Sequence, residues 1–114
     1  MTVYHRTTRE SADAILAGGF RDGRGRYLTE HEYTGVWVSD VPLDINEGAE
    51  GDVLLAIEVT PEAVDPFEWA EEGKTYREFL VPASILNSYA ARELSAEEAS
   101  AAEEESWRRR AGPC

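Results

Sequence analysis

The alternation of apolar and polar side chains along the chain predicts a series of short strands. Residues 3–6, 35–39 and 78–81 place every second side chain on one face, which is the period of a half-buried strand. Residues 53–59 are mostly aliphatic, which predicts a central strand covered on both faces. A last short strand is expected over residues 86–91. The polar, glycine-punctuated residues 21–33 are expected to form a loop.

Signals for helix ends occur near both ends of the chain. Residues 7–10 (TTRE) and 95–98 (SAEE) have the spacing of a capping box, in which a hydroxyl and a carboxylate satisfy the first backbone amides of a helix. The first helix should end at the glycine pair 18–19, because glycine readily adopts the left-handed conformation that closes a helix. The second helix is expected over residues 96–110.

The order of these elements indicates the fold class. Short helices are also expected over residues 43–50, from Pro61, and over residues 82–86. A strand and a helix followed by several short strands, without regular strand–helix alternation, predict a mixed α+β domain with mainly antiparallel sheets. We expect one domain, residues 1–93, and a solvated tail helix, residues 94–114, whose apolar stripe is thin.

Composition and charge narrow the classes of protein. The net charge of −12 argues against general nucleic-acid binding, and the 42% of hydrophobic residues indicates a globular chain. Residues 1–29 nevertheless carry a net charge of +2, which suits either a solvated loop or a corner that attracts a phosphorylated small molecule. The apolar runs are too short to span a membrane, and no signal segment begins the chain, so we expect a cytoplasmic protein.

Three strands each carry one unusual side chain: His5, Trp37 and Glu78. Taken alone, a strand histidine is more often structural than catalytic, and a strand tryptophan is more often part of a core. Glu78 shares its strand face with Leu80, so it is either an edge charge that reaches water or a carboxylate held in a cleft beside positive charge. A metal site is not expected, because Cys114 is the only cysteine and neither histidine has ligand spacing.

The local sequence around these three residues follows a known pattern. Residues 4–7 (YHRT) resemble an opening Y-H-G-[ST] strand, and residues 15–20 (ILAGGF) resemble an A-I-x-x-x-G-F helix end. Residues 35–39 (GVWVS) are similar to G-I-Y-F-A, and residues 76–81 (YREFLV) are similar to Y-x-E-[YF]-x-V. Together these motifs resemble the ADP-ribosyltransferases of the diphtheria-toxin and poly(ADP-ribose) polymerase type, whose site contains a histidine, a tyrosine and a glutamate.

The resemblance implies a split β-sandwich, and cleavage of the nicotinamide–ribose bond of NAD by transfer of ADP-ribose to an acceptor or to water. Glu78 would stabilise the oxocarbenium-like transition state, His5 would bind a ribose, and Trp37 would stack on nicotinamide. We expect these three side chains to line one cleft. The residues implied to contact NAD are His5, Arg6, Thr7, Trp37 and Ser39, with Tyr27 and Tyr33 as further stacking partners and Arg24 and Arg26 near the pyrophosphate.

Two departures from the family pattern leave an alternative open. Arg6 stands where the family has glycine, so its side chain must point away from the pocket, and Trp37 replaces tyrosine and lacks the hydroxyl. The alternative is a catalytically silent module that binds NAD, ADP-ribose or a protein. A related RNA 2′-phosphotransferase activity is less favoured, because this acidic chain has few basic residues for RNA. The acceptor, which is a protein, a nucleic acid or a small molecule, is not indicated.

Overall fold

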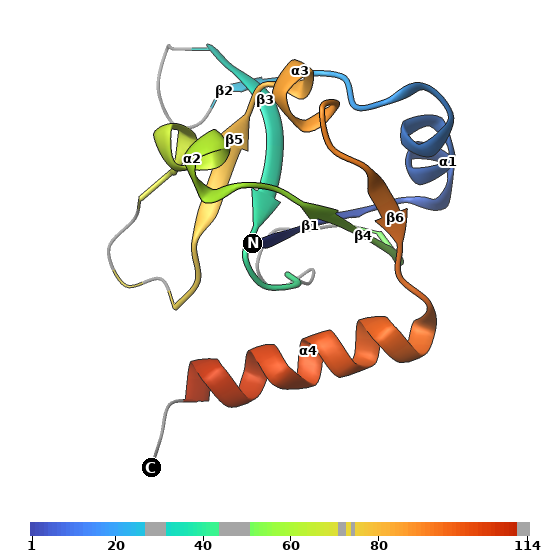
Figure 1. Cartoon of the computed structure of the whole chain (residues 1–114), viewed down its shortest axis with the longest axis vertical. Helices are drawn as coiled ribbons and strands as arrows, with labels where there is room; N and C mark the ends of the chain where they lie inside the picture. Colours follow the sequence, from blue (N-terminus) through green and yellow to red (C-terminus); the bar gives the residue numbers. More distant parts are fainter. Residues whose placement is uncertain (27–31, 44–50, 71–72, 74, 112–114) are drawn as a thin grey trace.

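The structure is a computed structural model that describes residues 1–26, 32–43, 51–70, 73 and 75–111, without the side chains of residues 23–26, 32–33 and 109–111. An antiparallel sheet lies at the centre, with helices packed around it (Figure 1). The strands are β1 (Thr2–Thr7), β2 (Gly23–Arg26), β3 (Glu32–Ser39), β4 (Val53–Glu58), β5 (Glu78–Val81) and β6 (Ala91–Glu93). The helices are α1 (Arg9–Gly18), α2 (Pro61–Val64), α3 (Ala83–Leu86) and α4 (Ala96–Ala111), with a 3-10 turn at Asp65–Phe67.

The first strand of the chain occupies the middle of the sheet. The strand order is β2–β3–β1–β4–β6, and β5 pairs with β3. β1 pairs with β4 along its whole length, from Thr2 opposite Glu58 to Thr7 opposite Val53. The predicted α+β class with antiparallel pairing is therefore confirmed. The described pairings join all six strands into one sheet, and the division into two sheets stays a prediction.

One face of the sheet carries the main core. Alternate side chains of the central strands point to this face, and α1 and α3 cover it together with Phe20. The fully buried residues with the largest side chains are Phe79, Leu55, Ile57, Leu86, Val3, Val38, Val41, Val64 and Val81. Since Phe79 is opposite Val38, and Val81 is opposite Val36, β3 and β5 present their buried side chains to the same face.

The first helix begins one residue later than its sequence indicates. Thr8 is the N-cap, and its hydroxyl accepts a hydrogen bond from the Ser11 amide at 3.2 Å. Thr7 does not cap the helix, because it is still paired with Val53 in the sheet. The end of the helix was predicted correctly: Gly19 has φ 90° and donates its amide to the Ile15 carbonyl at 2.7 Å.

Two further predictions on the strands need correction. Residues 23–26, expected in a loop, form β2 and pair with the first half of β3. This strand is made of glycine and arginine, so it carries no hydrophobic period that sequence reasoning detects. The last strand begins at Ala91 rather than near residue 86. The Asn87 side chain instead binds Phe20, accepting from its amide at 2.7 Å and donating to its carbonyl at 3.0 Å. The helix expected over residues 43–50 lies outside the described residues, apart from Leu43.

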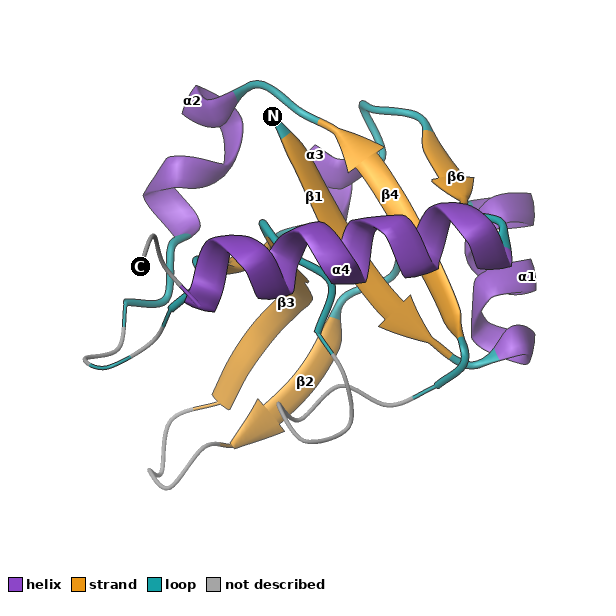
Figure 2. Ribbon diagram, turned by 90° about the horizontal axis from the view of Figure 1, so that it is seen from below, coloured by secondary structure: helices purple, strands orange, loops and turns teal. Residues whose placement is uncertain are grey.

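The opposite face of the sheet is crossed by α4 (Figure 2). Leu54, Ala56 and Leu94 form a second, smaller core there, and Tyr4 and Ala99 pack against it. The predicted capping box is present, since Ser95 and Glu98 exchange two hydrogen bonds of 3.1 Å. The helix expected to be a solvated tail thus contacts the sheet along part of its length.

An ion pair joins α4 to the first strand. The Arg6 side chain is only 12% exposed; it donates to the Leu43 carbonyl and to the Glu103 carboxylate, the latter at 2.6 Å. On the outer side of the helix, Glu104 pairs with Arg108, and both side chains are exposed. Neighbouring acidic residues of one helix therefore differ mainly in the burial of their partners.

This difference predicts unequal effects of the same substitution. We expect Glu103→Gln to lower the free energy of unfolding by about 1–2 kcal/mol, because it leaves the mostly buried Arg6 with a weaker partner. The matched variant Glu104→Gln should change it by less than about 0.5 kcal/mol, because its pair is exposed. Urea denaturation of the two variants measures the difference, and equal values would show that α4 does not hold Arg6.

Candidate functional site

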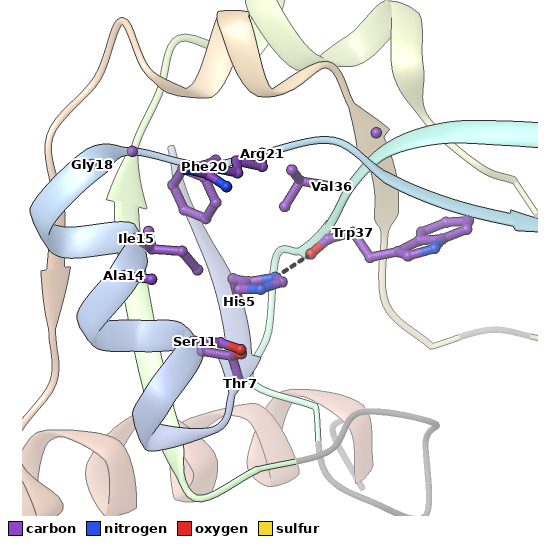
Figure 3. A pocket seen from close by; sticks show the side chains of 12 residues that line it. His5, Thr7, Ser11, Ala14, Ile15, Gly18, Phe20, Arg21, Val36 and Trp37 are labelled. Atoms are coloured by element: carbon purple, nitrogen blue, oxygen red, sulfur yellow. Dashed lines mark hydrogen bonds between the residues drawn. The ribbon is translucent and has the colours of Figure 1, made fainter.

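A pocket of about 480 Å³ opens between α1 and the strands β1 and β3 (Figure 3). His5 lies inside it, between the helix and the strands. The walls are mostly apolar, with Ile15 and Phe20 on one side and Val36 on the other. Arg21 adds one positive charge to the lining. An apolar pocket with a few polar groups is the usual form of a small-molecule site.

His5 is fixed by two contacts. Its Nδ1 lies 2.7 Å from the Trp37 carbonyl oxygen, and its ring meets the Phe20 ring edge-on, with 5.7 Å between centroids. A carbonyl oxygen only accepts, so Nδ1 carries the proton and Nε2 of the neutral ring is an acceptor. Burial lowers the pKa of His5 below its ordinary value of 6.5, while the hydrogen bond to Trp37 opposes this shift. His5 is thus a neutral acceptor at physiological pH.

The same hydrogen bond marks the place where two strands separate. β1 and β3 pair at Tyr4 opposite Ser39. Beyond this pair, the His5 side chain binds the Trp37 carbonyl, so an imidazole occupies a position that a backbone amide would fill in a continuous ladder. The His5 side chain thus bridges β1 and β3 where their backbone pairing ends.

Trp37 and Glu78 share one face of the sheet. Ser39 is opposite Glu78 and Trp37 is opposite Leu80, so these four side chains point away from the core face. Trp37 and Glu78 are diagonal neighbours, a relation that places backbone positions about 7–8 Å apart. The Trp37 indole points away from His5 and from the pocket (Figure 3). His5 therefore contacts the main chain of Trp37, whereas Glu78 lies on the side to which the Trp37 indole points. The expected single cleft lined by all three side chains is not seen in this pocket, whose lining includes His5 and Trp37 but not Glu78.

The other residues predicted to contact NAD do not all lie in the pocket. Thr7 lines the pocket beside His5. The Arg6 side chain points to α4, so Arg6 offers only its backbone to a ligand. The Ser39 hydroxyl is buried and donates to the Val41 carbonyl at 2.6 Å. Tyr27 lies outside the described residues, as do the side chains of Tyr33, Arg24 and Arg26.

Sequence reasoning missed Trp69 as a site residue. Its indole meets that of Trp37 edge-to-face, with 5.4 Å between centroids and 76° between planes. Its backbone amide donates to the Glu78 carbonyl at 2.8 Å. Trp69 thus contacts both Trp37 and Glu78, although the only signal in the sequence is that it is one of two aromatic residues, with Phe67, in an acidic connection. Arg21, one of several arginines near the first helix, is distinguished only by its position in the pocket.

The site and fold were compared with known proteins. No protein-family model, curated protein or solved structure matches this chain. In the described part of the chain, no three acidic, histidine or cysteine side chains gather in a way that would hold a metal ion. None of the described helices has the length and apolar character needed to cross a membrane. The class of protein that the structure defines is an α+β fold built on an antiparallel sheet.

The buried state of His5 predicts a pH dependence of stability. The pKa of His5 is lower in the folded protein than in the unfolded chain, so the unfolded chain binds the proton more readily. The contribution of the neutral His5 ring to the free energy of unfolding is fully present above pH 6.5. It is lost as the pH falls through the lowered pKa of the folded protein. His5→Asn, which keeps a donor for Trp37, should flatten this part of the curve. Melting temperatures of both proteins from about pH 7.5 to 5 test this, and parallel curves would contradict it.

Proposed function

We propose that this protein cleaves the nicotinamide–ribose bond of NAD, with transfer of ADP-ribose to an acceptor or to water. One observation carries the proposal. His5 of β1 contacts the main chain of Trp37 on β3, and Glu78 of β5 is the diagonal neighbour of Trp37 on the side of its indole. The order of their motifs resembles that of the ADP-ribosyltransferases, and the opening between β1 and β3 is compatible with the two-sheet cleft of a split β-sandwich.

The chemistry assigns Glu78 the central role. Loss of nicotinamide leaves positive charge on the ribose ring, and a carboxylate beside the ribose stabilises that charge in the transition state. Trp37 offers a ring face for nicotinamide on the same side of the sheet as Glu78. The same carboxylate would orient the incoming nucleophile, whose identity decides between transfer and hydrolysis.

The pocket beside His5 would take the remainder of the dinucleotide. The Nε2 acceptor of His5 suits a ribose hydroxyl, which is a hydrogen-bond donor. Arg21 suits a pyrophosphate oxygen at the same pocket, because guanidinium and phosphate groups form charge-assisted hydrogen bonds. His5 in this scheme binds and orients the ligand and transfers no proton.

A second function is favoured by the state of Ser39. The Ser39 hydroxyl already donates to the Val41 carbonyl. Ser39 was expected to contact NAD, and its engagement within the protein favours a silent module that binds NAD or ADP-ribose without cleaving it. Glu78 would then be a structural charge rather than a catalytic one.

Incubation with NAD separates the two functions. An enzyme releases nicotinamide in proportion to protein and time, whereas a silent module binds the dinucleotide and leaves it intact. Chromatography of the nicotinamide formed measures the first property, and calorimetry with ADP-ribose, which lacks the reacting bond, measures the second. A protein that binds neither NAD nor ADP-ribose would contradict both functions.

A further inference from the structure

A second cleft lies on the face of the sheet opposite the His5 pocket, beside the crossing of α4 over β1 (Figure 2). Its volume is about 540 Å³, and its lining combines Tyr4 of β1, Asp40 directly after β3, and Glu105 and Ser106 of α4. None of the residues assigned to the proposed function lines this cleft. A ligand bound here would therefore need no part of the proposed reaction.

Ser106 is the unusual residue of the cleft. Its side chain lies on the side of α4 that faces the sheet, and the residue is only 3% exposed. Among the described residues, its hydroxyl is the only buried side-chain oxygen or nitrogen without a hydrogen-bond partner. Such a group is costly, because the bonds that it would make with water are lost and not replaced. One rotation about the Cα–Cβ bond redirects a serine hydroxyl, so a polar ligand in the cleft can supply the missing bond.

Two carboxylates give the cleft a negative charge. Asp40 is partly buried, and its carboxylate accepts a hydrogen bond from the Arg77 amide at 2.9 Å. Glu105 lies one residue before Ser106, so it stands at the same end of the cleft as the unpaired hydroxyl. Within the described part of the chain, neither carboxylate forms an ion pair. Both therefore remain able to bind a cation.

The basic groups that line the cleft already have other partners. The Arg77 guanidinium binds Asp65 at 2.9 Å and Glu68 at 2.7 Å, both outside the cleft. The Met1 ammonium lies 3.7 Å from the Glu58 carboxylate. Since these positive charges are matched elsewhere, the cleft attracts a cation rather than an anion.

The donor set suits an organic cation better than a metal ion. A calcium ion takes about six to eight oxygen ligands, whereas the described residues offer no group of three metal-binding side chains. A primary ammonium has only three hydrogens to donate. The carboxylates of Asp40 and Glu105 and the hydroxyl of Ser106 can accept them, and Val41 and Pro42 provide apolar contacts for a carbon chain.

We propose that this cleft binds a small aliphatic amine in its ammonium form. The ammonium group binds the carboxylates of Asp40 and Glu105 and donates to the Ser106 hydroxyl, which gains the partner that it lacks in the free protein. Because one carboxylate follows β3 and the other belongs to α4, the bound amine joins the helix to the sheet.

The test uses putrescine, a four-carbon diamine, and 1,4-butanediol, a neutral molecule of the same length. Calorimetry on the full-length protein should show binding of putrescine and not of butanediol. Asp40→Asn, which keeps an acceptor for the Arg77 amide, and Ser106→Ala should each weaken putrescine binding about tenfold. Glu104→Gln removes the same charge from α4 outside the cleft and should keep the wild-type affinity.

Melting temperatures distinguish a ligand site from a packing defect. Without ligand, Ser106→Ala should melt a few degrees higher than wild type, because the unpaired hydroxyl is gone. Putrescine should raise the melting temperature of wild type and of Glu104→Gln, but much less that of Ser106→Ala and Asp40→Asn.

Three results would overturn the proposal. Equal effects of putrescine on wild type, Asp40→Asn and Ser106→Ala would show that the amine responds to net charge alone. Binding of putrescine no stronger than that of butanediol would show that the cleft does not select an ammonium group. Binding of magnesium ions that Asp40→Asn abolishes would make the cleft a metal site instead.

Discussion

Replacement of Glu78 by glutamine should lower the rate of nicotinamide release by about a hundredfold or more while NAD binding stays near the wild-type value. Glutamine keeps the shape and part of the hydrogen bonding of the side chain but removes the negative charge. A loss confined to kcat is the signature of an interaction felt mainly in the transition state, here the charge developing on the ribose. Steady-state kinetics and calorimetry on the same preparation give the two quantities.

His5→Ala provides the contrast to this variant. It removes the Nε2 acceptor and the hydrogen bond to the Trp37 carbonyl, so we expect weaker NAD binding together with a lower rate. If Glu78→Gln instead weakened binding and left kcat unchanged, Glu78 would be a binding residue and not a catalytic one. If neither wild type nor the variant released nicotinamide, the silent module would be the better account.

The largest effect on stability is expected from Phe79, the neighbour of Glu78. Its side chain is fully buried in the main core, whereas Leu80 points to the opposite face and is partly exposed. Phe79→Ala should lower the free energy of unfolding by about 3–5 kcal/mol, through lost burial and the cavity left behind.

Leu80→Ala is the matched control in the same strand. It removes a large apolar side chain from the adjacent position, and we expect a loss at most half as large. Urea denaturation of both variants measures the two values. Equal losses, or a larger one for Leu80, would mean that β5 is shifted by one residue, which would turn Glu78 toward the core.

The parts of the fold that follow from a hydrophobic period were predicted from sequence. β5 has one buried face, so the order of its side chains determines which way they point, and β4 was predicted from its continuous aliphatic run rather than from a period. β2 has no such face, and its pairing with β3 depends on the partner strand alone. The N-cap of α1 was misplaced by one residue, because two adjacent threonines both satisfy the capping pattern and only the length of β1 decides between them.

The candidate site was predictable only where single residues are unusual. The sequence motifs around His5, Trp37 and Glu78 identified these three residues. Their positions relative to one another could be determined only from the strand register. The place of Trp69 in the site depends on a contact between segments far apart in the chain. In the sequence, Arg77, the paired arginine that positions the Trp69 segment, looks like any exposed charge. The bond between His5 and the Trp37 carbonyl has no sequence signal, because it forms only where β1 and β3 separate.

The central position of β1 has a consequence for biosynthesis. β1 is synthesised before its partners: it pairs with β4, some fifty residues later in the chain, and its Arg6 binds Glu103, which is 97 residues away. Such a contact order predicts slow folding, since the N-terminal half cannot complete its sheet alone. His5 therefore acquires its surroundings only after β3 and β4 have been made, and the ion pair that anchors its strand forms only after α4 has been made. Any activity of this site would then begin only after these elements have been synthesised.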